Sequence, residues 1–184
     1  MANPLLKIWQ ASQPALRKPR LWTAHLLRRL LVRTTFIAIT GSNGKSTATR
    51  YLAAILSAQA PTQWTRLNRN GPAGATETIA FCKPWKTRFA VFEVGAGGAG
   101  ILRQVTQLVR PQVAIVLSVF LEHRSYFKSL EAVAIEKAIV LSQLPPDGIA
   151  VLNADDPLVA NMPVPPGRKV IRFGVDAVND VHYE

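Results

Sequence analysis

The segment Thr40–Thr47, with the sequence TGSNGKST, constrains the fold of this chain more than any other feature. An apolar run rich in β-branched residues precedes it, and a stretch with helical spacing of apolar residues follows it. A glycine-containing turn that ends in Gly-Lys-Ser between a strand and a helix is typical of a phosphate-binding loop. Gly41 and Gly44 let the backbone turn tightly, so that N–H groups at the helix N-terminus can face phosphate oxygens. The spacing is shorter than usual, because Ile39 stands where the first glycine is expected.

Strand-like and helical patterns alternate along the rest of the chain. We expect strands at 34–40, 89–94, 112–119, 148–153 and 169–173, and helices at 44–58, 101–109 and 129–144, with a short helix opening at 155–157. The prolines and glycines of 60–88 indicate a long loop-rich region. This alternation predicts an α/β fold with a mainly parallel sheet flanked by helices. Ser129 is expected to cap its helix, and Asp155 and Asp156 to cap the short one rather than to catalyse.

The charge is placed unevenly. Residues 1–76 contain eleven basic residues and no acidic one, so the net charge of +11 belongs to that part of the chain. We interpret 1–20 as an irregular arm with a helical piece around 5–11. Residues 21–33 are expected to form a basic amphipathic helix, with one apolar side and with Arg28, Arg29 and Arg33 on the other. This helix either packs on the domain with its charges in water or contacts an anionic lipid or substrate.

Composition excludes several classes of protein. The single cysteine, Cys82, excludes an internal disulfide framework and a multi-cysteine metal site. A hydrophobic content of 48% excludes wholesale disorder. No apolar run approaches the roughly 20 residues that a membrane-spanning helix needs. Tryptophans lie among the basic residues of the N-terminal part, but no nucleic-acid-binding motif accompanies them, so no specific nucleic-acid partner is expected. The expected location is cytoplasmic, with peripheral contact to a membrane left open.

Five stretches, in order, resemble motifs of the Mur ligases, the ATP-dependent amide-bond-forming enzymes of peptidoglycan synthesis. They are TGSNGKST at 40–47, FEVGAG at 92–97, EHR at 122–124, AIEKA at 134–138 and GIAVLNADDP at 148–157. The resemblance covers about residues 34–175, which would be the ATP-binding central domain. The FEVGAG block looks most like the D-alanyl-D-alanine-adding ligases. Cyanophycin, poly-γ-glutamate and folylpolyglutamate synthetases are similar in the same domain.

The resemblance implies a set of site residues that serve ATP and Mg²⁺. Nucleotide would be bound by Gly41, Ser42, Asn43, Gly44, Lys45, Ser46 and Thr47, with Lys45 at the β- and γ-phosphates. The metal ligands would be Ser46, Glu93, His123 and Lys137, the last as an anionic carbamate because an ammonium repels Mg²⁺. Lys45, His123 and Lys137 would be the catalytic residues. Asn68 resembles a residue of a substrate-side loop, and Ser118 stands where many members carry asparagine.

The expected function is that of the ATP-binding domain of an amide-bond ligase that works through an acyl phosphate. We expect two parts, a basic arm and helix at 1–33 and the ATP-binding domain at 34–184, the latter incomplete at its C-terminus. Mur ligases usually have three domains, so the chain is expected to be truncated or to need a partner chain, and its own catalytic activity stays open. The alternatives are a noncatalytic nucleotide-binding or interaction module, or a fragment of a poly-γ-glutamate or cyanophycin-type synthetase. The acceptor carboxylate and the amine donor are not identified by the sequence.

Overall fold

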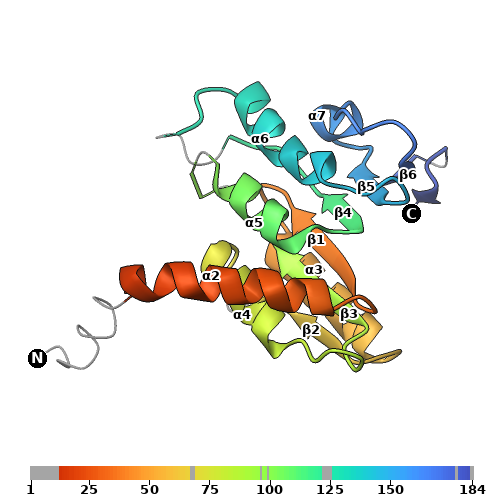
Figure 1. The fold of residues 1–184 in the computed structure, drawn as a ribbon. Coiled ribbons are helices and arrows are strands. Elements are labelled where there is room, and N and C mark those ends of the chain that lie inside the picture. The colour runs from red at the N-terminus through yellow and green to blue at the C-terminus, as the bar shows by residue number, and fades with distance from the viewer. Residues whose placement is uncertain are drawn as a thin grey trace, which may run out of the picture.

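A seven-stranded sheet organises the computed structural model of this chain, in which residues 13–66, 69–95, 97–98, 100–121, 126–176 and 178–182 are described (Figure 1). The strand order is β2-β3-β1-β4-β5-β6-β7. Each pair of neighbouring strands is parallel. The strands are β1 (Thr35–Thr40), β2 (Thr62–Trp64), β3 (Phe89–Glu93), β4 (Val113–Val116), β5 (Ile149–Asn153), β6 (Lys169–Gly174) and β7 (Val181–His182). This arrangement confirms the predicted fold class.

Helices cover both faces of the sheet. They are α2 (Gln13–Leu30), α3 (Lys45–Ser57), α4 (Pro72–Phe81), α5 (Ile101–Val109), α6 (Leu130–Ser142) and α7 (Pro157–Ala160). Alternate residues of β1 point to opposite faces, as the pleat of a strand requires. Ile37 and Ile39 pack with α3, whereas Phe36 and Ala38 belong to the larger core that α2, α4, α5 and α6 cover.

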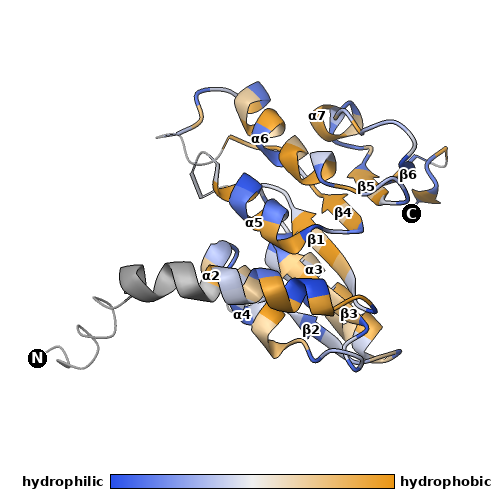
Figure 2. Ribbon diagram, in the orientation of Figure 1, coloured by the Kyte–Doolittle hydropathy of each residue, from blue (hydrophilic) through white to orange (hydrophobic). Residues whose placement is uncertain are grey.

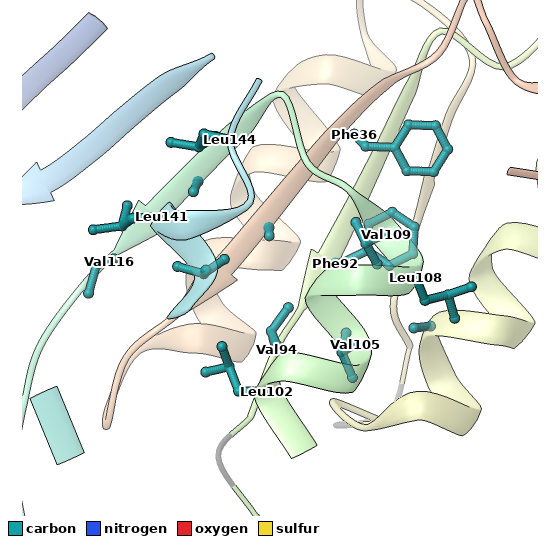
Figure 3. Packing of buried hydrophobic residues seen from close by; sticks show 14 of the residues in the cluster. Phe36, Phe92, Val94, Leu102, Val105, Leu108, Val109, Val116, Leu141 and Leu144 are labelled. Atoms are coloured by element: carbon teal, nitrogen blue, oxygen red, sulfur yellow. The ribbon is translucent and has the colours of Figure 1, made fainter. Parts of the chain in front are cut away.

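Aromatic and aliphatic side chains fill the larger core. The Phe36 and Phe92 rings, from the adjacent strands β1 and β3, stack with centroids 5.6 Å apart. Figure 3 shows the same core with inward-facing residues of α5, among them Leu102 and Val105. These residues are completely buried. Burial of such side chains is the main favourable contribution to folding.

The helices and strands expected from the patterns at 34–58 and 89–173 are present, with ends shifted by a few residues. The interpretation of 60–88 as loop was wrong in part, because this region holds β2 and α4. The glycines and prolines of this region were interpreted as loop signals, although two of them lie within α4. Pro72 occupies the first turn of α4, where its missing N–H costs nothing. A Cβ on Gly74 would lie 1.7 Å from the Arg69 carbonyl oxygen, so glycine here serves close packing.

The basic N-terminal helix differs from its prediction in extent and in orientation. Helix α2 begins at Gln13, not at 21, and it ends at Leu30. The expected helical piece around 5–11 lies outside the described residues. The apolar residues at 22, 26, 27, 30 and 31 were predicted to share one buried side of this helix. Of these, Trp22, Leu26 and Leu30 are 74%, 53% and 59% exposed. Figure 2 shows the resulting bands of apolar and polar residues on the C-terminal half of α2.

A half-buried arginine, Arg28, accounts for this orientation. The Arg28 Nε and Nη2 atoms donate to the carbonyl oxygens of Val109 (2.6 Å) and Arg110 (2.9 Å), at the C-terminal end of α5. Its guanidinium also lies 3.7 Å from the centre of the Phe36 ring. Burial, with repulsion from Arg110, lowers the pKa of Arg28 to about 10, so the side chain stays charged at neutral pH. No helix of the described ranges is long and apolar enough to cross a membrane.

Candidate nucleotide-binding site

The loop between β1 and α3 depends on two glycines. Gly41 has φ 152° and Gly44 has φ 79°, values that other residues rarely adopt. A Cβ on Gly41 would also lie 2.9 Å from the Leu117 Cβ, in the segment that follows β4. Gly44 directly precedes the first turn of α3. The N–H groups of such a first turn have no carbonyl partner within the helix and can bind an anion.

The segment after β4 holds this loop in place. The Ser42 N–H donates to the Ser118 carbonyl (2.8 Å), and the Ser42 hydroxyl donates to the Phe120 carbonyl (3.0 Å). The Asn43 N–H donates to the Ser118 hydroxyl (3.2 Å). Ser118 therefore gives the loop a hydroxyl acceptor at the position where the resemblance expects asparagine.

The Lys45 ammonium is folded over the loop. Its Nζ atom donates to the carbonyl oxygens of Gly41 (2.6 Å) and Ser42 (2.9 Å). A positive charge is thus held beside the backbone turn and the N-terminus of α3. Both features favour a polyanionic ligand.

Glu93, the last residue of β3, faces the same turn. It is 4% exposed, and it lies opposite Ile39 in the pairing of β1 with β3. The Ser46 hydroxyl donates to Glu93 Oε2 (2.9 Å), and the Asn70 amide donates to Glu93 Oε1 (3.2 Å). These hydrogen bonds offset the cost of burying a carboxylate. Each carboxylate oxygen is therefore held in a defined place.

A cavity of about 300 Å³ lies between these groups. Its walls are formed by the phosphate-loop residues, Glu93 and the loop before α4: Ser42, Asn43, Gly44, Lys45, Ser46, Thr47, Asn70 and Glu93. Six of the seven residues predicted to bind nucleotide line it, and the seventh, Gly41, shapes the turn. The structure thus brings Ser46 and Glu93 together with the loop, while their roles stay predictions.

Asn70 is the site residue that the sequence reasoning missed. Asn68 in the same loop was preferred, and Asn68 lies outside the described residues. The Gly95 N–H donates to the Asn70 carbonyl (2.9 Å), and a Cβ on Gly95 would meet the Asn70 side chain at 2.7 Å. Gly95 of the FEVGAG stretch therefore makes room for Asn70 beside Glu93. The contact between Gly95 and Asn70 identifies Asn70 as a site residue, and this contact can be seen only in the folded structure.

Two predicted site residues are not seen at the cavity. His123 and the rest of its motif, 122–124, lie outside the described residues. Lys137 is completely buried on α6, and it is not among the residues that form the cavity wall. Within the described ranges, no three His, Cys, Asp or Glu side chains cluster in a way that could hold a metal. The metal roles of His123 and Lys137 therefore stay predictions.

Both aspartates of the LNADDP stretch were predicted to cap the short helix, and this is confirmed for Asp156 alone. The Asp156 carboxylate accepts from the N–H groups of Leu158 (3.0 Å) and Val159 (3.2 Å) and caps α7. Its other oxygen accepts from the Val119 N–H (2.7 Å). Asp155 accepts from the N–H of Val175 (3.0 Å). Asp156 therefore fixes the segment after β4, which in turn holds the phosphate loop.

Comparisons with known proteins identify relatives of this chain. The sequence profile described as the Mur ligase middle domain matches residues 39–184. The UDP-N-acetylmuramoyl-tripeptide–D-alanyl-D-alanine ligase of Escherichia coli K12 is 38% identical over 144 residues, which cover 78% of this chain and 32% of that protein. The chain thus spans about a third of the length of this relative.

Solved structures resemble the chain over a similar range. A crystal structure of MurF from Acinetobacter baumannii superposes with a TM-score of 0.80 at 27% identity, covering 86% of this chain and 35% of that one. MurF ligase from Thermotoga maritima in complex with ADP gives a TM-score of 0.74 at 27% identity, covering 85% and 37%. The fold is shared with Escherichia coli FolC, at a TM-score of 0.56 and 18% identity.

Proposed function

Because the chain belongs to the Mur ligase family, whose middle-domain profile matches residues 39–184, we propose that it binds ATP in the cavity beside TGSNGKST and activates a carboxylate there. The observation that carries this proposal is the contact between Ser46, in the first turn of α3, and the buried Glu93. It unites a phosphate-loop hydroxyl with a carboxylate in the wall of a cavity that Lys45 also lines. The ADP complex of the Thermotoga maritima relative supports the choice of nucleotide.

The protein groups suit a nucleoside triphosphate. The first turn of α3 directs N–H groups and a partial positive charge toward the phosphates. Lys45 leaves the carbonyl oxygens of Gly41 and Ser42 and pairs with phosphate oxygens, exchanging neutral acceptors for charged ones. Charge-assisted hydrogen bonds of this kind are about twice as strong as neutral ones.

The donor set at Glu93 fits Mg²⁺. The Ser46 hydroxyl and the Glu93 carboxylate are hard oxygen ligands, which Mg²⁺ prefers. When bound, the ion neutralises negative charge on the phosphates. Asn70 keeps one oxygen of Glu93 occupied and so turns the other toward the loop. His123 and Lys137, the latter as its carbamate, are proposed as further ligands on the resemblance alone.

The proposed reaction is amide-bond formation in two transfers. A substrate carboxylate oxygen attacks the γ-phosphorus of ATP, which forms an acyl phosphate and releases ADP. An amine then attacks the acyl carbon, and the C–O bond to phosphate breaks with loss of a proton from nitrogen. The relative's name suggests a peptide carboxylate and a D-alanyl-D-alanine amine. Because the chain spans about a third of that relative, we propose that further protein, in the same or a partner chain, presents these substrates. We propose a cytoplasmic location, where ATP is available.

Calorimetric titration of the chain with ATP and Mg²⁺ tests the proposal. Wild type is expected to bind, and Lys45→Ala to bind at least about tenfold more weakly, as expected for the loss of a charged hydrogen bond. Lys169→Ala is the matched control, because Lys169 is an exposed lysine on β6. Glu93→Gln should remove most of the dependence on Mg²⁺. Wild type without ATP binding, or Lys45→Ala with unchanged affinity, would refute the proposal.

A further inference from the structure

The outward side of α2 is apolar and has no partner within the described fold. Trp22, Leu26 and Leu30 recur every four residues, so they form one stripe along the helix. Each exposes more than half of its surface, whereas Ala24 and Leu31 are buried in the core. Large apolar side chains in such a row mark an interaction surface more often than isolated ones do.

Basic residues lie along this stripe. Arg29 and Arg33 are exposed beside Leu26 and Leu30. Arg28, the neighbour of Arg29, is half-buried and contacts the end of α5 instead, so it does not belong to this outward-facing group. An apolar stripe with arginines beside it is the pattern of a helix that lies in a membrane interface.

A second segment extends the same surface. The Arg33 guanidinium lies 5.0 Å from the centre of the Trp85 ring, and the Thr34 hydroxyl donates to the Thr87 carbonyl (2.7 Å). Trp85 is 66% exposed and has φ 68°, a backbone conformation that is unfavourable for a bulky residue. Lys83 and Lys86 on either side of it are also exposed. The fold therefore presents this indole at a cost in stability, next to the end of α2.

The positive charge of this surface indicates an anionic partner. Residues 1–76 contain no acidic residue, and neither does the stretch 78–92 around Trp85. We propose that the α2 docking face, formed by Trp22, Leu26, Arg29, Leu30, Arg33 and Trp85, binds the surface of a bilayer that contains anionic phospholipid. Tryptophan and leucine enter the interface, and the arginines meet the phosphate headgroups.

Binding in this way leaves the nucleotide site free. The residues that form the cavity wall come from the phosphate loop, α3, β3 and the loop before α4, and α2 contributes none of those described. Helix α3 and the docking face lie on opposite faces of the sheet. The bilayer would therefore hold the domain at a surface without covering the loop. The proposal does not depend on the proposed enzymatic activity.

Co-sedimentation of the full chain with vesicles tests this inference. We expect binding to phosphatidylcholine–phosphatidylglycerol vesicles and little binding to phosphatidylcholine alone. The double variant Leu26→Gln, Leu30→Gln should lower the partition coefficient at least about tenfold, because two apolar side chains no longer enter the interface. Arg29→Gln and Arg33→Gln should each lower it about fivefold and reduce its dependence on salt.

Matched variants keep the test decisive. Tyr51→Gln with Ile55→Gln removes two side chains on α3 that are 69% and 63% exposed, and it should leave vesicle binding unchanged. Circular dichroism should show unchanged folding for every variant, since all replaced side chains are exposed. Equal binding to both kinds of vesicle, or an equal loss in the α3 variant, would overturn the proposal. So would light scattering that shows a dimer abolished by the Leu26 and Leu30 changes, or preferential binding of the same face to duplex DNA.

Discussion

Arg28→Ala should destabilise the domain far more than the same change at the next position. The truncation removes two hydrogen bonds from a charged donor to the end of α5 and a contact with the Phe36 ring. Hydrogen bonds to charged groups contribute about 1.5–3 kcal/mol each, and a cation–π contact about 0.5–2 kcal/mol. Water can reach the exposed carbonyl of Arg110 in the variant, which recovers part of this energy. The expected loss is therefore about 3 kcal/mol in the free energy of unfolding.

Urea denaturation at pH 7, followed by far-ultraviolet circular dichroism, measures this loss. The midpoint should fall with little change in slope, because the area exposed on unfolding stays similar. The melting temperature should drop by about 10 °C for a domain of this size. Arg28→Lys should give an intermediate loss, since an ammonium keeps the charge but cannot form the planar, two-pronged contact.

Arg29→Ala is the control. Its side chain is exposed, and the change should stay within about 0.5 kcal/mol. If Arg28→Ala costs no more than Arg29→Ala, then Arg28 does not anchor α2 on α5. The explanation given above for the orientation of the apolar stripe would then be wrong.

Two further changes test the loop and the core. Gly41→Ala should cost about 2 kcal/mol and abolish nucleotide binding, because its φ of 152° and the Leu117 Cβ at 2.9 Å leave no room for a methyl group. Gly71→Ala, where a Cβ meets nothing within 4 Å, should change neither stability nor calorimetric affinity. Burial raises the pKa of the Cys82 thiol to about 12 from 9.0, so the unfolded chain loses this proton at lower pH than the folded one. The free energy of unfolding should therefore fall as pH rises above about 9 in wild type, and it should fall less in Cys82→Ala. Urea midpoints of the two proteins measure this difference. Rapid reaction of the Cys82 thiol with a disulfide reagent at pH 8 in the folded protein would contradict its burial.

The parallel sheet and the phosphate loop could be predicted because their signals are local. A β-branched run, two glycines and Gly-Lys-Ser before a helical pattern determine strand, turn and helix within a few residues. The pairing of Ser46 with Glu93 followed from the resemblance and not from local pattern, because the two residues are far apart in the chain. The sheet brings them together by placing β3 beside β1.

Helix α4 and Asn70 were missed for a related reason. The glycine and proline of 72–74 read as loop signals, and only the contact with the Arg69 carbonyl shows why Gly74 belongs in a helix. Asn68 and Asn70 are equivalent by composition, and only the fold shows that Asn70 packs against Gly95.

Helix α2 shows most clearly what the sequence determines and what only tertiary packing determines. Its basic and amphipathic character is written in the order of residues, because charge and helical periodicity are local properties. Tertiary structure decides which side of α2 packs on the protein, because either the apolar stripe or Arg28 can face the core, but not both. The carbonyl groups at the end of α5 and the ring of Phe36 offered the arginine partners that no leucine could use. Trp22, Leu26 and Leu30 therefore face outward, where they form part of the surface proposed to bind a membrane.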